Sequence, residues 1–496
     1  MNFETIIGLE VHVQLLTRSK MFCGCSADYA TAPPNTHVCP VCLGMPGVLP
    51  VINRQAVEYT IMTALTLNCT VSEYTKFDRK NYPYPDLMKG YQISQYDAPI
   101  GKGGWLGIEV DGQKKKVGIT RVHLEEDVAK LLHRKGADGE EYSLVDVNRS
   151  GVPLMEIVGE PDLRSPEEAR QYLVKLRSIL QYLGVSTGNM EEGSFRCDAN
   201  ISILAEGSSE TGPKVEVKNM NSFRAVYQAM DYEAKRQRKA FSEGKKLTQE
   251  TRGWVEEKGK TVSQRSKEYA HDYRYFPEPD LPPLSISREW VEEIKAKMPK
   301  ELPEERRDRF MAQYSLSRDD AELLTSSRDD ADYEEEFIEI FGKTGEGTRL
   351  SLFEKAKLGS NWILGEVRRI TNANNIEITD FRQRVNPERL VNLTDLMVKG
   401  SITGTIAKPV LEEMFNTGKS AEEIIEERGL SQISDMGELE ASTTKVINSN
   451  AQAVSDYKAG KDTALKFLVG QVMRATKGRA NPVLAGELLK KKLDEG

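Results

Sequence analysis

Near the start of the chain, a carboxylate and an imidazole lie two positions apart in the sequence. Glu10 and His12 occupy alternate positions of the segment 6–15, with apolar residues between and around them. In an extended strand, alternate side chains project from the same face, about 6.8 Å apart along the chain. Side by side, the two groups can share a divalent cation or a proton. A solvated strand face is the alternative that this pair alone leaves open.

Four further segments alternate polar and apolar residues in the same way. Their polar positions hold carboxylates, amides, an imidazole and cations: Arg121, His123, Glu125, Asp146, Asn148, Asp198, Asn200, Glu216, Lys218, Asn219 and Asn221. These residue types bind divalent metals and phosphates, whereas a merely solvated face favours Lys, Glu and Thr. Oxygen-rich ligands favour Mg²⁺, and a histidine also tolerates Mn²⁺. The pattern predicts a polar site built from several strands.

No standard phosphate-binding loop accompanies this pattern. The sequence contains neither a Walker A motif nor a Rossmann glycine motif. The glycines of the segment 101–104 are typical of a hairpin turn before Trp105. A nucleotide at the predicted site would therefore be bound without such a loop.

Four of the six cysteines lie within residues 23–42. Cys23 and Cys25 form one close pair, and Cys39 and Cys42 follow after a gap of 13 residues. Two close pairs of thiolates suit a tetrahedral Zn²⁺ ion with a closed ligand shell, which is a structural site. The alternative is a set of four reduced surface thiols.

Two kinds of segment are candidates for RNA contact. The loops 80–96 and 272–277 combine Tyr and Pro with basic residues, so they either stack on bases or line a rigid cleft. The tail, residues 457–496, holds nine Lys and Arg against four Asp and Glu. Arg474, Lys477 and Arg479 cluster there, which fits either phosphate contact or a solvated helix end.

A sheet is needed to position these residues. A chain of 496 residues is long enough for two to four domains. Short alternating segments separated by Gly and Pro are typical of antiparallel strands. One helix interrupts them, because Ser165 to Glu168 form a capping box and Gly184 is a plausible stop. Beyond residue 290 the pattern becomes helical and charged. We predict an α+β chain with an antiparallel-sheet domain (1–290), an all-helical domain (291–405) and a small helical tail domain (406–496).

Bulk properties exclude several classes of protein. The net charge is −8, so any RNA contact must come from a local patch and not from the overall field. No run of 18 apolar residues occurs, and we expect no membrane span. The first residues carry acidic side chains and lack a basic region or cleavage site, which argues against a signal peptide. Together with the clustered cysteines, this predicts a cytoplasmic protein.

Several long motifs resemble the B/E subunit family of tRNA-dependent amidotransferases. They are residues 7–15, 19–22, 46–53, 148–156, 272–280, 469–474 and 478–482. The resemblance covers essentially the whole chain, and motifs of this length are highly specific. Pro83 and Met88 depart from the usual family pattern, and Pro83 stiffens a loop that we place near the cleft or channel.

The resemblance implies a cradle domain, a helical domain and a helical tail within a multisubunit enzyme. Family members phosphorylate the side-chain carboxylate of Glu-tRNA(Gln) or Asp-tRNA(Asn) with ATP. Ammonia then arrives through a channel from an amidase (glutaminase) A subunit, and a small C subunit clasps the other two. The implied activity is that of a glutamine-hydrolysing, ATP-dependent carbon–nitrogen ligase. A non-catalytic scaffold that presents tRNA, and a free-standing zinc RNA-binding protein, are the rival hypotheses.

The resemblance also implies roles for individual residues. Glu10, His12 and Glu125 match the catalytic Mg²⁺ site, and Glu156 is a further candidate ligand. The expected ATP-contact residues are Arg149, Asp198, Glu216, Lys218 and Asn219. Structural Zn²⁺ is expected at Cys23, Cys25, Cys39 and Cys42, and tRNA at Arg474, Lys477 and Arg479.

Overall fold

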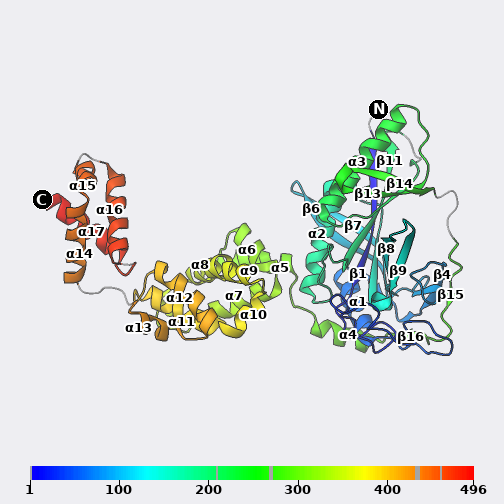
Figure 1. The fold of residues 1–496 in the computed structure, drawn as a ribbon, viewed down its shortest axis with the longest axis horizontal. Coiled ribbons are helices and arrows are strands. Elements are labelled where there is room, and N and C mark those ends of the chain that lie inside the picture. The colour runs from blue at the N-terminus through cyan, green and yellow to red at the C-terminus, as the bar shows by residue number, and fades with distance from the viewer. Residues whose placement is uncertain are drawn as a thin grey trace. The chain divides into compact units, whose positions relative to one another are not determined.

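A computed structural model describes residues 3–207, 211–266, 272–430, 436–458, 461–476 and 478–495. The chain divides into two compact units, Met1–Lys300 and Glu301–Gly496 (Figure 1). Antiparallel-dominated sheets characterise the first unit and helices the second, so the predicted α+β class is confirmed. Within the described ranges, no helix is long and apolar enough to cross a membrane.

A nine-stranded sheet is the framework of the first unit. Its strand order is β14-β13-β12-β11-β1-β10-β7-β6-β2. The strands are β1 (Phe3–Gln14), β2 (Thr70–Val71), β6 (Gly101–Val110), β7 (Gln113–Glu126), β10 (Pro153–Gly159), β11 (Phe195–Ala205), β12 (Val215–Lys218), β13 (Glu250–Val255) and β14 (Lys260–Ser266). Neighbours pair antiparallel, except that β12 and β13 run parallel.

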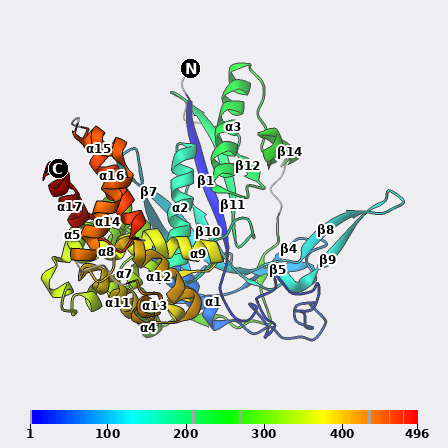
Figure 2. The ribbon, with the colours of Figure 1, turned by 60° about the vertical axis from the view of Figure 1, so that its left-hand side comes forward.

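One face of this sheet is apolar and carries the core. Leu9, Val11 and Val13 of β1 are buried there with residues of α1 (Arg54–Thr66), α2 (Pro166–Tyr182) and α3 (Phe223–Ser242). Figure 2 shows α2 and α3 running along the sheet beside β1 and β11. Because successive side chains of a strand alternate between faces, the polar residues of β1 project from the opposite face.

The predicted capping box starts α2. The Ser165 hydroxyl accepts a hydrogen bond from the backbone N–H of Glu168, and Pro166 is the first helical residue. The helix ends at Tyr182, and Gly184 takes a φ of 68°, a conformation that favours glycine. Its buried residues include Leu173 and Leu176, so the predicted apolar stripe faces the sheet.

Smaller sheets flank the nine-stranded one. A three-stranded sheet has the order β15 (Phe276–Pro277), β4 (Asp78–Asn81), β5 (Tyr91–Ser94). The hairpin of β8 (Lys130–Lys135) and β9 (Glu141–Asp146) and the pair of β3 (Tyr74–Thr75) and β16 (Leu284–Ser285) are separate. Pairing of β4 with β15 joins the two Tyr-rich loops, although about 190 residues separate them in the chain, and the Asn81 N–H donates to the carbonyl of Tyr273 at 2.9 Å.

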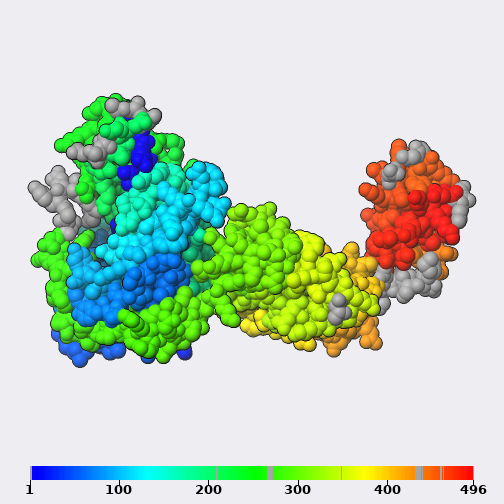
Figure 3. Space-filling view, turned by 180° about the vertical axis from the view of Figure 1, so that it is seen from behind, coloured from blue at the N-terminus to red at the C-terminus, as the bar shows by residue number. Residues whose placement is uncertain are grey.

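The first unit extends beyond residue 290. The expected boundary falls inside α4 (Arg288–Lys297), whose Ile294 is buried in the core of this unit. The Trp290 indole N–H donates to a Glu58 oxygen of α1 at 3.1 Å. In the space-filling view, the green surface of this segment lies against the blue surface of the N-terminal elements (Figure 3).

The second unit is helical and contains two apolar clusters, one formed by residues between 310 and 425 and one by residues between 439 and 493. Its helices are α5 (Pro303–Tyr314), α6 (Arg318–Thr325), α7 (Arg328–Phe341), α8 (Leu352–Asn361), the π-helix η4 (Trp362–Val367), α9 (Arg368–Asn374), α10 (Ile378–Arg384), α11 (Pro387–Val398), α12 (Gly404–Thr417), α13 (Ala421–Arg428), α14 (Met436–Ser449), α15 (Ala451–Lys458), α16 (Asp462–Ala475) and α17 (Pro482–Glu495). The expected boundary at 405/406 lies inside α12, whose Ile406 and Ala407 pack in the first cluster.

Candidate functional site

Three adjacent strands bring the predicted ligands together on the polar face of the nine-stranded sheet. His12 of β1 pairs in register with Glu156 of β10, and Glu156 pairs with His123 of β7. Cross-strand partners share a face, with Cβ atoms about 4.5–5.5 Å apart. Glu125 lies two residues beyond His123 and therefore projects from the same face. The four side chains meet although they come from distant parts of the chain.

A cluster of three possible ligands results. One ligand atom each from His12, Glu125 and Glu156 lies within 4.8 Å of the other two. His12 Nε2 is 3.7 Å from Glu125 Oε1 and 3.8 Å from Glu156 Oε2. One imidazole and two carboxylates are a donor set that suits Mg²⁺ or Mn²⁺.

Glu10 lies on the same face but outside this cluster. Its Oε1 accepts a hydrogen bond from Asn200 Nδ2 at 2.8 Å, and its register partner on β11 is Asp198. The spacing of alternate residues, about 6.8 Å, places Glu10 beside His12 without bringing their ligand atoms together. The ligand role of Glu10 therefore stays a prediction.

The charges of the site keep Glu156 ionised. Burial by itself would raise the pKa of Glu156. The neighbouring His123 and His12, a hydrogen bond from His123 at 3.2 Å and the charge of Lys80 lower this pKa well below its usual range. The carboxylate is therefore available as an anionic ligand at neutral pH.

His123 received no role from the sequence beyond its place in the alternating pattern. It is 2% exposed, and its Nε2 faces Glu156. Its Nδ1 is buried without a hydrogen-bond partner among the described residues. The signal that could have found it was its spacing of two from Glu125 on one strand.

The Tyr-rich loops form a cationic and aromatic wall beside the carboxylates. Lys80 Nζ lies 5.6 Å from the ring centroid of Tyr82 and 5.1 Å from that of Tyr273. Burial would lower the pKa of Lys80, but the negative charges of Glu125 and its neighbours raise it above the ordinary value. Lys80 is thus a cation that faces the anionic cluster.

The predicted nucleotide contacts on β11 and β12 extend the polar face. Lys218 Nζ is 2.6 Å from Asp198 Oδ2 and 3.3 Å from Glu216 Oε1. Burial would lower the pKa of Lys218, but these two carboxylates raise it. Asn219 follows β12 with a φ of 63°, a left-handed conformation that Asn tolerates.

The two arginines near the site have different environments. Arg149 donates from Nε to the carbonyl of Val128 at 2.9 Å and from Nη2 to the carbonyl of Ala129 at 3.0 Å. Arg196, which sequence reasoning missed, is the register partner of His12 and projects from the polar face. Its place two residues before Asp198 on an alternating strand was the available signal.

The four clustered cysteines converge as a second group. Cys42 Sγ lies 3.5 Å from Cys23 Sγ, 3.7 Å from Cys39 Sγ and 3.8 Å from Cys25 Sγ. A tetrahedron with Zn–S bonds of about 2.3 Å has sulfur atoms about 3.8 Å apart. The hydrogen bond from Cys23 and the charge of Lys20 outweigh burial and lower the pKa of Cys42 to about 4. The group therefore has the composition and the size of a zinc site.

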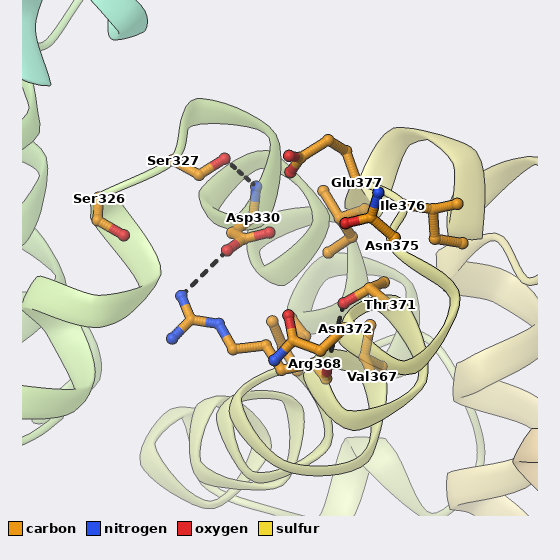
Figure 4. A pocket seen from close by; sticks show the side chains of 12 residues that line it. Ser326, Ser327, Asp330, Val367, Arg368, Thr371, Asn372, Asn375, Ile376 and Glu377 are labelled. Carbon is orange, nitrogen blue, oxygen red and sulfur yellow. Dashed lines mark hydrogen bonds and ion pairs between the residues drawn. The ribbon is translucent and has the colours of Figure 1, made fainter. Parts of the chain in front are cut away.

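The second unit holds a cavity of about 490 Å³ that none of the predicted site residues lines. Figure 4 shows Arg368 reaching across it to Asp330, with an Nη2–Oδ2 distance of 3.2 Å. In the tail, Arg474 is an exposed residue of α16 and Arg479 precedes α17. The third predicted tRNA contact, Lys477, lies outside the described residues.

Comparison with known proteins gives matches over nearly the whole chain. Residues 5–292 match the family model described as GatB/GatE catalytic domain, and residues 349–493 match the model described as GatB domain. The chain is 61% identical to the B subunit of the aspartyl/glutamyl-tRNA(Asn/Gln) amidotransferase from Dehalococcoides mccartyi strain CBDB1, over 100% of this chain and 99% of that protein. Proteins of the same name from Carboxydothermus hydrogenoformans (55%; 99% and 99% covered) and Moorella thermoacetica (54%; 99% and 100%) are similar over the same extent.

Proposed function

The chain belongs to the GatB/GatE family, and we propose that it is the subunit in which a tRNA-bound carboxylate is phosphorylated and then amidated. The substrates are Glu-tRNA(Gln) and Asp-tRNA(Asn), and ATP is the phosphoryl donor. Ammonia reaches the site from a glutamine-hydrolysing A subunit, and a small C subunit completes the assembly, which works in the cytoplasm. The relatives named above, which are amidotransferase B subunits, support this proposal.

The observation that carries the proposal is the convergence of His12, Glu125 and Glu156 on the polar face of the nine-stranded sheet. We assign Mg²⁺ to these three residues, with Glu10 beside them. When bound, Mg²⁺ would neutralise phosphate charge during the transfer. The chain's own contribution is to hold charged ligands in place and to surround them with fixed cations.

Chemistry explains why both steps belong together. A carboxylate is a poor electrophile, so one of its oxygens first bonds to the γ-phosphorus of ATP while the bond to ADP breaks. Ammonia then attacks the acyl carbon, and the phosphate leaves with the electron pair of the broken bond. Lys80 and Lys218 are cations on either side of the ligand cluster, suited to the anionic substrate and to ATP respectively.

The remaining assignments follow the division of the chain. The first unit, Met1–Lys300, holds the reaction site and a structural Zn²⁺ at the four clustered cysteines. The helical second unit, Glu301–Gly496, holds the tRNA body, with Arg474, Lys477 and Arg479 as phosphate contacts. The exposed position of Arg474 supports this last assignment.

An assay of the assembled three-subunit enzyme tests the proposal. ADP formation that depends on Glu-tRNA(Gln) or Asp-tRNA(Asn) should fall about 10³-fold in His12→Ala and in Glu125→Gln, because an electrostatic catalyst of phosphoryl transfer is lost. Glu109→Gln, at an exposed position of β6, is the matched control and should keep the rate. Filter binding should show that all three variants retain tRNA.

The rival scaffold hypothesis predicts a different result. If ADP formation survives both His12→Ala and Glu125→Gln, these residues do not catalyse the transfer and the chain only presents tRNA. Amidation of tRNA by the isolated chain with glutamine would contradict the multisubunit arrangement.

A further inference from the structure

We propose that Arg196 contacts the phosphoryl group in transfer, and that Asp127 is the positioning residue that holds Arg196 there. This inference rests on the proposed function. It gives a role to an arginine that has no sequence-based assignment, and it moves the phosphate contact expected at Arg149 to a different side chain.

Arg196 lies at the edge of the ligand cluster. It is the β11 partner of His12 in the register, so both side chains project from the polar face with Cβ atoms about 4.5–5.5 Å apart. Its side chain is 36% exposed, and the charge of Glu125 contributes to its electrostatic environment. A ligand bound to the cluster would therefore lie within reach of the guanidinium.

A buried carboxylate holds one end of this guanidinium. Arg196 Nη2 donates to Asp127 Oδ2 at 2.7 Å, and Asp127 is 2% exposed. Gln14 Nε2 donates to the same oxygen at 2.7 Å, and the backbone N–H of Val128 donates to Oδ1 at 2.9 Å. Asp127 comes two residues after Glu125, so the tether and the metal ligand belong to one segment.

Part of the guanidinium is left for a ligand. Arg196 Nε is buried and has no hydrogen-bond partner among the described residues. This nitrogen is covered by the protein, so a ligand would meet the remainder of the side chain, which as a whole is 36% exposed. A planar fork with one side tied to Asp127 is pre-organised to donate its remaining N–H groups to phosphate.

Arg149 supports Asp127 instead of contacting the phosphoryl group. Both of its described donors bind backbone carbonyls, and its Nε lies 3.6 Å from Asp127 Oδ1. Its charge therefore helps to keep Asp127 ionised and ready to hold Arg196. Arg149 and Gln14 form a support around Asp127, and Arg196 is the member of the group that faces the site.

The chemistry of the transfer needs such a group. As a carboxylate oxygen of the aminoacyl group bonds to phosphorus and the bond to the ADP oxygen breaks, negative charge spreads over the phosphoryl oxygens. ADP leaves with the electron pair of the broken bond. An arginine aimed at these oxygens stabilises the charge, and removing one costs about 10³–10⁵-fold in rate in other phosphoryl-transfer enzymes.

The test compares Arg196→Ala, Arg196→Lys and Asp127→Asn in the three-subunit enzyme with Glu-tRNA(Gln). Two quantities are measured: tRNA-dependent ADP formation, and the calorimetric affinity for MgADP with and without aluminium fluoride, which mimics the phosphoryl group in transfer. For Arg196→Ala we expect kcat to fall about 10²–10³-fold. MgADP affinity should stay within about threefold, and the gain in affinity from aluminium fluoride should disappear.

The other variants separate a phosphate contact from a structural one. Arg196→Lys keeps the charge near Asp127 but not the planar fork, so kcat should fall at least about tenfold. Asp127→Asn should lower kcat by a smaller factor than Arg196→Ala and should weaken the aluminium fluoride complex. The matched control is Arg236→Ala, which removes an arginine from buried Glu233 on α3, and this variant should keep both quantities.

Three outcomes would overturn the inference. Unchanged kcat and unchanged aluminium fluoride affinity in Arg196→Ala would show that the side chain only pairs with Asp127. If Arg196→Lys keeps the wild-type kcat, the planar fork is not needed for the transfer. This result would overturn the inference even if Arg196→Ala did not fold. Absence of tRNA-dependent ADP formation in the wild type would instead overturn the proposed function and this inference with it.

Discussion

Two aspartate–arginine pairs, one in each unit, show how differently the two halves of the chain treat a buried charge. Asp127 pairs with Arg196 in the first unit, and Asp330 pairs with Arg368 in the second (Figure 4). Burial by itself would raise the pKa of both aspartates. For Asp127 the charges of Arg196 and Arg149 win and the pKa is lowered, whereas for Asp330 burial wins and the pKa is raised.

Two glutamates repeat the contrast. Glu156 of the first unit lies between His12 and His123, and its pKa is depressed. Glu334 of α7 is fully buried, neither of its oxygens accepts a side-chain hydrogen bond among the described residues, and burial raises its pKa well above the ordinary value. The supply of cations around an acid, and not burial alone, decides its charge. The pKa values of Glu156 and Asp127 in the first unit are lowered, whereas those of Glu334 and Asp330 in the second unit are raised.

The largest expected effect comes from removing charge in the first unit. Glu156→Gln should weaken Mg²⁺ binding and lower tRNA-dependent ADP formation by about 100-fold or more. Loss of a residue that only supports a metal ligand already costs up to about 100-fold. A Mg²⁺ titration of the rate measures this, with Glu109→Gln as the control. An unchanged Mg²⁺ dependence would show that the charge of Glu156 does not serve a metal.

Next in size is the removal of zinc. Cys42→Ser, or a chelator added to the wild type, should release the metal and lower the unfolding temperature of the first unit by about 5 °C or more, because metal binding contributes to folding. Elemental analysis and a thermal scan measure the two quantities. Cys69→Ala, at a buried thiol outside the cluster, should keep the zinc. A wild-type protein purified without zinc would contradict the assignment.

The raised pKa of Glu334 predicts a contribution to stability that falls as pH rises. The folded pKa of Glu334 is raised, so its contribution is complete below the unfolded value of about 4.5 and is lost as pH increases towards the folded value, with a slope of at most about 1.4 kcal/mol per pH unit. Glu334→Gln keeps the shape of the side chain but has no group that ionises, so it should remove this slope. At pH 8, α7 should then be more stable in the variant than in the wild type.

Hydrogen exchange of α7 peptides at pH 5 and pH 8, corrected for intrinsic rates, measures this difference. Glu339→Gln, at an exposed position of the same helix, is the control and should leave the slope in place. Equal slopes in the wild type and Glu334→Gln would mean that Glu334 is ionised in the folded chain, and the comparison of the two units would fail.

The smallest effect is expected at the cavity of the second unit. Asp330→Asn removes a charge that burial already disfavours and a pair with a partly exposed arginine, so it should cost less than about 1 kcal/mol of unfolding free energy. Asp127→Asn leaves two arginines beside an uncharged partner and should cost more, about 3 kcal/mol. Urea unfolding measures both, and equal costs would remove the distinction between the pairs.

Local patterns predicted much of this architecture. Alternation placed Glu125, Asp198 and Lys218 on polar strand faces, and the capping box at Ser165 placed the start of α2 correctly. The cysteine spacing anticipated the convergence of four thiols. The domain boundaries were harder to predict from the sequence. The local sequences of α4 and α12 are helical, but both helices pack with the elements that precede them.

The sequence by itself determined which side chains share a face of each strand, since alternation and capping depend only on residues a few positions apart. Only the tertiary structure decided which faces adjoin. Placing β10 between β1 and β7 brought Glu156 and His123 to His12, while Glu10 went to Asn200. Likewise Arg149 turned to backbone carbonyls and Arg196 to the site. Strand order and register come from pairing between segments that other elements separate in the chain, and no local pattern encodes that pairing.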